Sequence, residues 1–171
     1  MVPTLPRLSI LAAALALALP SAASAASRTA AATGQATMLS SLSVLKTADL
    51  DFGTLVVTGA GTAAMDPVSG TLSTTGSVTK AGTAAHAATF TGTGSKNSVV
   101  HIRIPTAPIT LTRVGGSETM SVSTWTLDGA ANRKVPPTDV FTFAVGATAT
   151  VAAGQAEGTY VGTFSVTVQY P

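Results

Sequence analysis

The stretch Gly158-Thr-Tyr-Val-Gly-Thr-Phe-Ser-Val-Thr-Val-Gln-Tyr170 alternates bulky apolar residues with small or polar ones. The bulky residues share one face of an extended chain: Tyr160, Phe164, Val166, Val168 and Tyr170. A period of two residues is typical of a half-buried β-strand. Such a strand has to cover its apolar face by docking into a sheet or by pairing with a partner, so this stretch bears on both fold and function.

Further along the chain, short segments with the same alternation are separated by Gly, Pro and Asp. In Ser98–Ile104 the apolar face carries Val100, Ile102 and Ile104. In Thr119–Leu127 the apolar parity switches, which predicts a β-bulge. Short strands spaced about ten residues apart, with no helical period outside the N-terminal segment, predict an all-β sandwich; a closed barrel is the alternative.

Two regions have weaker patterns. Thr58–Gly70 is rich in Gly and Ala and contains the turn signal Asp66-Pro67, so we predict a loop there. Phe141–Val145 and Ala149–Val151 each alternate over a short distance, and we predict two separate strands.

Residues 1–26 have the features of an export signal. Arg7 precedes an apolar run of twelve residues, Leu8–Leu19, which is too short to cross a bilayer of about 30 Å as a helix. Small residues at Ala23-Ser24-Ala25 suit a cleavage site, and the site one residue later suits it as well. We therefore expect a signal peptide and export to the periplasm, cell surface or medium, with no stable membrane span. A permanent N-terminal anchor is the alternative.

The mature chain is expected to be an arm followed by one domain. Ser27–Thr37 contains Ala, Thr and Gly with a single arginine, which predicts a flexible N-terminal arm, and residues 38–171 form the β-sandwich domain. The chain has no cysteine, so packing or pairing with neighbours has to replace the disulfides of many small secreted domains. Only 9% of residues are charged, which leaves strand edges weakly protected against pairing.

The charged residues point away from several functions. Without Arg7 the chain carries eight Lys and Arg against seven Asp and Glu, and the bases are scattered, so we expect no nucleic-acid binding. The only histidines are His86 and His101, which are too few for a zinc site without cysteine. Neither lies in a catalytic motif, so we expect a protein that is not an enzyme and has no metal or cofactor.

Two further features have an ordinary structural interpretation. Asp49 and Asp51 alternate with Leu50 and Phe52, so we interpret them as the polar face of a strand rather than the start of a calcium loop. Trp125 is the only tryptophan, and a core role is favoured over a sugar-stacking role.

Two blocks of the chain, Leu42–Leu55 and Gly158–Tyr170, resemble a family of exported bacterial proteins known only as a domain of unknown function. Members carry L-x-F-G near the mature N-terminus and G-x-Y-x-G-x-(F/V)-x-V-x-V-x-Y at the C-terminus. The second block is also similar to the spore coat U, or secreted pilin, family and more loosely to chaperone–usher fimbrial subunits. The resemblance spans about residues 37–171.

The pilin resemblance implies an incomplete immunoglobulin-like β-sandwich. Its missing strand would come first from a periplasmic chaperone and then from the arm of an identical or related subunit. Ser27–Thr37 would be that donor arm, and the assembly interface would be Phe164, Val166, Val168 and Tyr170. The expected function is a structural subunit of a cell-surface fibre, pilus or coat. A complete sandwich acting as a secreted or periplasmic module that binds glycan or peptide is the alternative.

Overall fold

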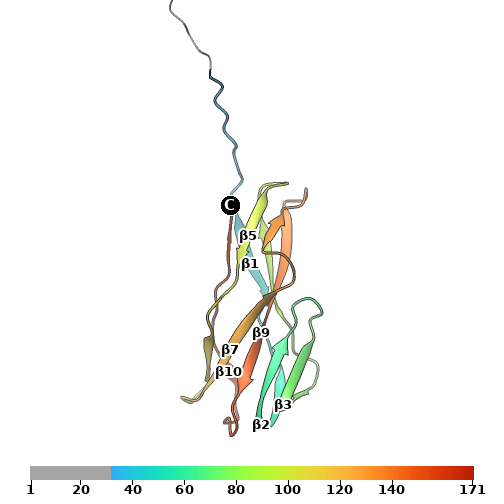
Figure 1. The fold of residues 1–171 in the computed structure, drawn as a ribbon, viewed down its shortest axis with the longest axis vertical. Coiled ribbons are helices and arrows are strands. Elements are labelled where there is room, and N and C mark those ends of the chain that lie inside the picture. Colours follow the sequence, from blue (N-terminus) through green and yellow to red (C-terminus); the bar gives the residue numbers. More distant parts are fainter. Residues whose placement is uncertain (1–31) are drawn as a thin grey trace, which may run out of the picture. The chain divides into compact units, whose positions relative to one another are not determined.

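The computed structural model describes residues 32–171; the predicted signal peptide and residues 27–31 of the predicted arm lie outside the described residues. The chain separates into two units, Met1–Ala36 and Thr37–Pro171, and the second contains all the described strands (Figure 1). Residues 32–37, the described part of the predicted arm, are exposed and have no regular structure. Within residues 32–171 no helix has the length and hydropathy that a membrane crossing requires.

The described residues form eleven strands and no helix. The strands are β1 (Ser43–Ala48), β2 (Thr54–Met65), β3 (Leu72–Ala81), β4 (Ala88–Thr93), β5 (Val99–Arg103), β6 (Ile109–Arg113), β7 (Thr119–Leu127), β8 (Asn132–Lys134), β9 (Val140–Val151), β10 (Tyr160–Val161) and β11 (Thr167–Gln169).

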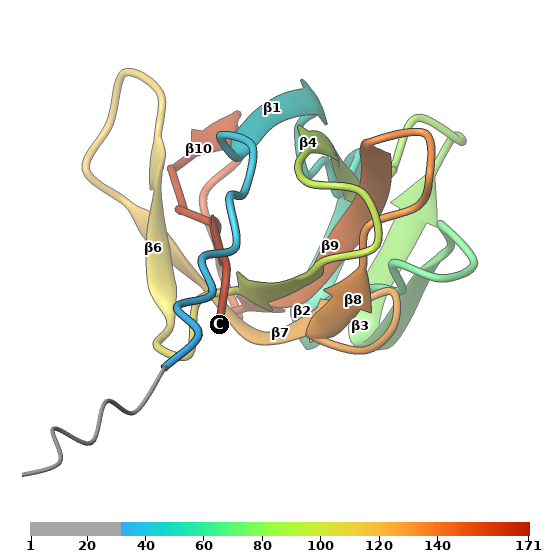
Figure 2. The same cartoon turned by 90° about the horizontal axis from the view of Figure 1, so that it is seen from above.

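The strands build two antiparallel sheets. The larger sheet has the order β1-β4-β9-β7-β6-β10, and the β2–β3 hairpin joins it through β9. The smaller sheet has the order β11-β5-β8. Seen from above, the sheets curl around a shared interior (Figure 2). The prediction of an all-β sandwich is confirmed.

The main core lies between the two sheets. Phe90 of β4 and Phe143 of β9 stack with ring centroids 5.0 Å apart. They pack with Val100 and Ile102 of β5 in the smaller sheet. The predicted inward face of Ser98–Ile104 is therefore confirmed, since Val100 and Ile102 are buried while Val99 and Arg103 are exposed.

β9 is one strand of twelve residues, so the prediction of two strands in this region is wrong. The inward positions keep the same parity throughout β9, from Phe141 through Val145 to Val151, and all of them are buried. Gly146 and its small neighbours interrupt the run of bulky residues in the sequence, but the strand continues through them. A Cβ atom at Gly146 would lie 2.2 Å from the carbonyl oxygen of Met65, so close packing against the β2–β3 hairpin requires glycine there.

The predicted loop over Thr58–Gly70 is also wrong, because β2 continues to Met65. Its inward residues in this part are small, as at Gly61 and Ala63, so the apolar side of the strand was not visible as a period of large side chains. The predicted turn is present: Asp66 Oδ1 accepts the Val68 N–H at 2.8 Å. That hydrogen bond also lowers the pKa of Asp66.

The predicted β-bulge in β7 is confirmed. The register with β9 shifts between Ser123 and Thr126, and Thr124 has a φ of 51°. Because the bulge adds a residue, both Val122 and Trp125 face the interior despite their different parity.

The last stretch of the chain belongs to both sheets. β10 pairs with β6 of the larger sheet and β11 pairs with β5 of the smaller one. Gly162–Val166, between them, belongs to no ladder in the described structure. The prediction of one continuous strand is therefore wrong, although the alternation of buried and exposed residues is as expected. The reason is that a strand crossing between packed sheets has to leave one ladder before it joins the other.

Candidate functional site

A groove separates the two ends of the larger sheet. In the described structure, β1 pairs only with β4 and β10 pairs only with β6, so each has one unpaired edge. The groove has a volume of 1420 Å³ and is lined by parts of two segments, 46–57 and 155–164. We call these the first wall and the second wall. β1 and β10 lie on the same side of the domain in Figure 2.

The floor of the groove is apolar. Its side chains come from the walls and from β4, β6 and β7: Leu50, Phe52, Leu55, Phe90, Ile109, Leu111, Met120, Val122, Trp125 and Phe164. Phe164 lies against Trp125, with ring centroids 4.8 Å apart. Trp125 packs against the main core and its Nε1–H donates to the Ala107 carbonyl at 3.1 Å, which confirms a core role, although it also lines the groove.

The first wall is shaped by the L-x-F-G block. Leu50 packs against the main core and against two smaller apolar clusters, one that contains Ala63 and Met65 and one that contains Val122 and Ala149. Phe52 packs against the two smaller clusters. Between them, Asp51 forms a two-way backbone bridge with His86, at 2.9 and 2.8 Å. Gly53 follows with a φ of 66° and donates its N–H to Asp51 Oδ1 at 2.7 Å. The block therefore turns the chain sharply while it directs two large side chains inward.

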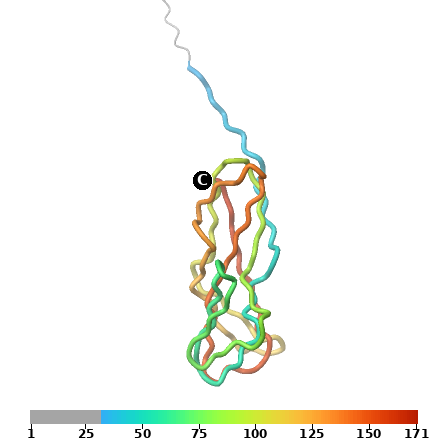
Figure 3. The backbone as a smooth tube through the Cα atoms, turned by 90° about the vertical axis from the view of Figure 1, so that its right-hand side faces the viewer, coloured from blue at the N-terminus to red at the C-terminus, as the bar shows by residue number. Residues whose placement is uncertain are grey.

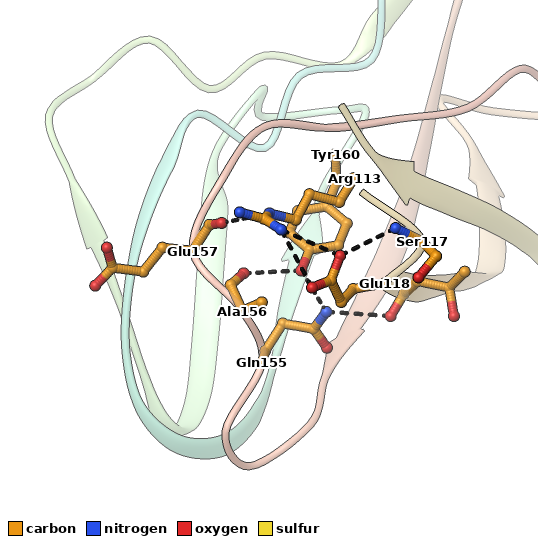
Figure 4. Close-up of polar contacts among 8 residues, drawn as sticks. Arg113, Ser117, Glu118, Gln155, Ala156, Glu157 and Tyr160 are labelled. Carbon is orange, nitrogen blue, oxygen red and sulfur yellow. Dashed lines mark hydrogen bonds and ion pairs between the residues drawn. The ribbon is translucent and has the colours of Figure 1, made fainter. Parts of the chain in front are cut away.

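The second wall is attached to the β6–β7 hairpin by Arg113 (Figure 4). Arg113 Nε–H donates to the Glu157 carbonyl at 2.7 Å, and Nη1 donates to both Glu118 carboxylate oxygens at 3.1 and 3.2 Å. The Glu118 backbone N–H and the Arg113 guanidinium lower the pKa of Glu118. Gly158 has a φ of 143°, and a Cβ there would lie 2.7 Å from Arg113 Nε, so the turn requires glycine.

Gln155 and Tyr160 add a second attachment to the same wall. Gln155 Nε2 donates to the Thr119 carbonyl at 3.1 Å and to the Tyr160 hydroxyl at 2.7 Å. The Tyr160 hydroxyl donates to the Ala156 carbonyl at 2.8 Å (Figure 4). One of these hydrogen bonds joins the second wall to β7, and the other two lie within the second wall. None of them reaches the first wall.

The chain segments that carry the two walls meet at Tyr170. The Ser95 N–H donates to the Tyr170 hydroxyl oxygen at 2.7 Å, which lowers the pKa of Tyr170. The Tyr170 hydroxyl donates to the Ser40 carbonyl at 3.0 Å, and the Ser40 N–H donates to Ser95 Oγ. We call these three residues the Tyr170 clasp. The clasp joins the chain just before β1 to the chain just after β11. The two segments are therefore connected at Tyr170, whereas the groove separates them beside β10.

The four predicted interface residues have different positions. Phe164 lines the groove, whereas Val166, Val168 and Tyr170 pack against the main core and do not line it. The prediction missed the other residues of the groove floor, which come from the first wall and from β4, β6 and β7. The L-x-F-G block was a signal for the first wall, but no local pattern shows that β6 and β7 lie beneath it.

The ionisable groups of the described residues do not gather into a site. Residues 32–171 contain no group of three His, Cys, Asp or Glu side chains that could hold a metal ion. His101 lies on the outer face of β5, with Nδ1 2.6 Å from Asn132 Oδ1, and His86 lies at the first wall.

The chain belongs to a family described as domain of unknown function (DUF4402), whose match covers residues 42–170. The match includes both sequence blocks and every strand of the domain. Figure 3 shows the course of the chain, coloured by residue number. The predicted membership of a family of unknown function is therefore confirmed. No curated protein and no solved structure matches this chain.

Proposed function

We propose that this protein is an exported, non-enzymatic structural subunit of a cell-surface fibre, pilus or coat. It assembles when a strand from another molecule enters the groove between β1 and β10. The observation that carries the proposal is a groove with an apolar floor between the two unpaired end strands of one sheet. The proposal treats the fold as an immunoglobulin-like sandwich that is short of one strand.

The unpaired main chain favours a strand as the occupant. An edge strand presents unpaired N–H and C=O groups, and an extended peptide can pair with them. β1 offers one such edge, and Gly162–Val166 offers five residues of unladdered chain on the other side. A strand between them would sit about 4.8 Å from each neighbour and would join the ends of the larger sheet.

The donor in this proposal is the Ser27–Thr37 arm of an identical or related subunit. Its apolar residues on one parity are small, namely Ala30, Ala32 and Ala36. Each methyl group buried in the groove contributes only about 0.8 kcal/mol. Main-chain hydrogen bonds, at about 0.5–1.5 kcal/mol each, then have to contribute at least as much as the side chains. The arm should consequently bind through its length rather than through one anchoring residue.

Export explains why a chaperone belongs to the proposal. The predicted signal peptide directs the chain out of the cytoplasm, and the apolar floor would be exposed until a second subunit arrives. A periplasmic chaperone that lends a strand would protect the groove during this interval.

The test compares mature protein, residues 27–171, with a truncated form that lacks Ser27–Thr37. We expect the mature protein to form polymers and the truncated form to remain a folded monomer. A synthetic peptide of residues 27–38 should bind the truncated form and change the fluorescence of Trp125, which lines the groove. A control peptide with aspartate at positions 30, 32 and 36 should not. Equal polymerisation of both proteins would refute the role of the arm.

The alternative, a secreted or periplasmic module that binds glycan or peptide, uses the same groove. It predicts that the mature protein stays monomeric at every concentration and that its own arm peptide does not compete for the groove. Size-exclusion chromatography with light scattering separates the two functions.

A further inference from the structure

Ser40 is held through both of its backbone hydrogen-bonding groups. Its N–H donates to Ser95 Oγ, and its carbonyl accepts the Tyr170 hydroxyl at 3.0 Å. The Ser95 N–H completes the Tyr170 clasp at 2.7 Å. Ser40 lies three residues before β1, so the clasp holds the point at which the chain enters the domain.

The packing around the clasp fixes the following residues too. Leu42 packs against the main core. A Cβ atom at Gly94 would lie 3.0 Å from the Tyr170 hydroxyl oxygen and 3.1 Å from Leu42 Cδ1, so glycine allows this close approach. The Gly94 N–H donates to the Asp139 carbonyl at 3.0 Å, which anchors the loop that carries Ser95.

This anchoring bears on where the arm can go. The groove adjoins the unpaired edge of β1, so an arm that entered the groove of its own molecule would have to reverse direction just before Ser43. A tight reversal needs a turn of four residues, often closed by a backbone hydrogen bond. Ser40 and Leu42 fall in that turn, and the clasp already uses both backbone groups of Ser40 in a segment without regular secondary structure.

We propose that the Tyr170 clasp decides which molecule fills the groove. It prevents the arm from folding back into its own groove, so the groove stays open for the arm of a second copy. This inference rests on the proposed function. Tyr170 is a positioning residue here: it acts on the arm through Ser40 and does not line the groove.

The test uses mature protein with Tyr170→Phe, which removes two hydrogen bonds of the clasp, and, separately, Ser95→Ala, which removes one. The matched control is Ser43→Ala, which removes a neighbouring hydroxyl pair with Thr93, 2.7 Å long, outside the clasp. Because the chain has no cysteine, two introduced cysteines at positions 33 and 165 carry the only spin labels. Thr33 lies on the opposite parity of the arm from Ala30, Ala32 and Ala36, and Ser165 does not line the groove. Labelled protein is diluted with unlabelled protein so that distances within one molecule are measured.

We expect both clasp variants to gain a short distance between the two labels and to lose at least half of the polymer that the control forms. Each variant is also made in the truncated form, where its urea midpoint reports stability alone. Polymers and label distances identical to those of Ser43→Ala would overturn the role of the clasp. Absence of polymer from the unmodified mature protein would instead refute the proposed function. In that case the label distances still test the clasp, since a short distance in the unmodified protein would contradict it.

Discussion

Replacing Phe164 with alanine tests the packing of the groove floor. The Phe164 ring is partly buried and contacts two other rings, Trp125 at 4.8 Å and Phe90 at 6.4 Å between centroids. Burying about half of a phenylalanine side chain is worth ~1 kcal/mol. Each aromatic pair adds ~0.5–1.5 kcal/mol, so we expect the free energy of unfolding to fall by about 2–4 kcal/mol.

Urea unfolding of the truncated monomer measures this effect. At a slope of about 1–3 kcal/mol per molar urea, the midpoint should fall by at least ~0.7 M. The fluorescence of Trp125 provides a second readout, because removal of the adjacent ring lets water reach the indole and should shift its emission to the red. The fluorescence signal is unambiguous, since Trp125 is the only tryptophan.

Val161→Ala is the matched control for Phe164→Ala. Val161 lies in the same wall but its side chain is 56% exposed, so we expect a change below about 0.5 kcal/mol. If Phe164→Ala lowers the free energy of unfolding no more than Val161→Ala does, the packing of the Phe164 ring in the groove floor is refuted. The ring would then stabilise the domain no more than an exposed side chain does.

Two other predictions concern the second wall and the β9 strand. The pKa of Glu118 is below its usual 4.5 in the folded protein, so the ionised Glu118 side chain stabilises the fold above pH 4.5. This stabilisation is lost as the pH falls through the lowered pKa. Glu118→Gln should therefore reduce the urea midpoint at pH 7 and leave it unchanged at the lowest pH at which the protein folds. Gly146→Ala places a Cβ 2.2 Å from the Met65 carbonyl oxygen and should cost at least ~2 kcal/mol, whereas Gly34→Ala, which has no atom within 4 Å, should have no measurable effect on the thermal midpoint. Equal pH dependence of wild type and Glu118→Gln, or a stable Gly146→Ala variant, would contradict the respective argument.

The two walls of the groove are attached to the domain separately. The second wall is attached to β6 and β7 through Arg113 and Gln155, while the first wall is attached to the core through Leu50 and Phe52. Each wall is therefore held from its own side, and the Tyr170 hydroxyl joins the chain segments that carry them. A groove built in this way does not need an occupant to keep its walls in place.

Local physics made several features predictable from the sequence alone. The two-residue period that placed Phe164, Val166, Val168 and Tyr170 on one face is a property of any extended chain, and their partial burial follows it. The turn at Asp66 also depends on neighbouring residues only, and the switch of apolar parity near Thr124 was a local signal for the bulge.

The tertiary structure decided what depends on residues distant in the chain. Gly146 continues a strand because Met65 packs over it, and Gly61–Met65 pairs as a strand although its inward residues before Met65, Gly61 and Ala63, are small. Above all, the groove exists because the larger sheet ends at β1 on one side and at β10 on the other, so its walls come from segments that are distant in the chain. A periodic pattern reports which face of a strand is apolar, but pairing between strands decides whether anything covers that face.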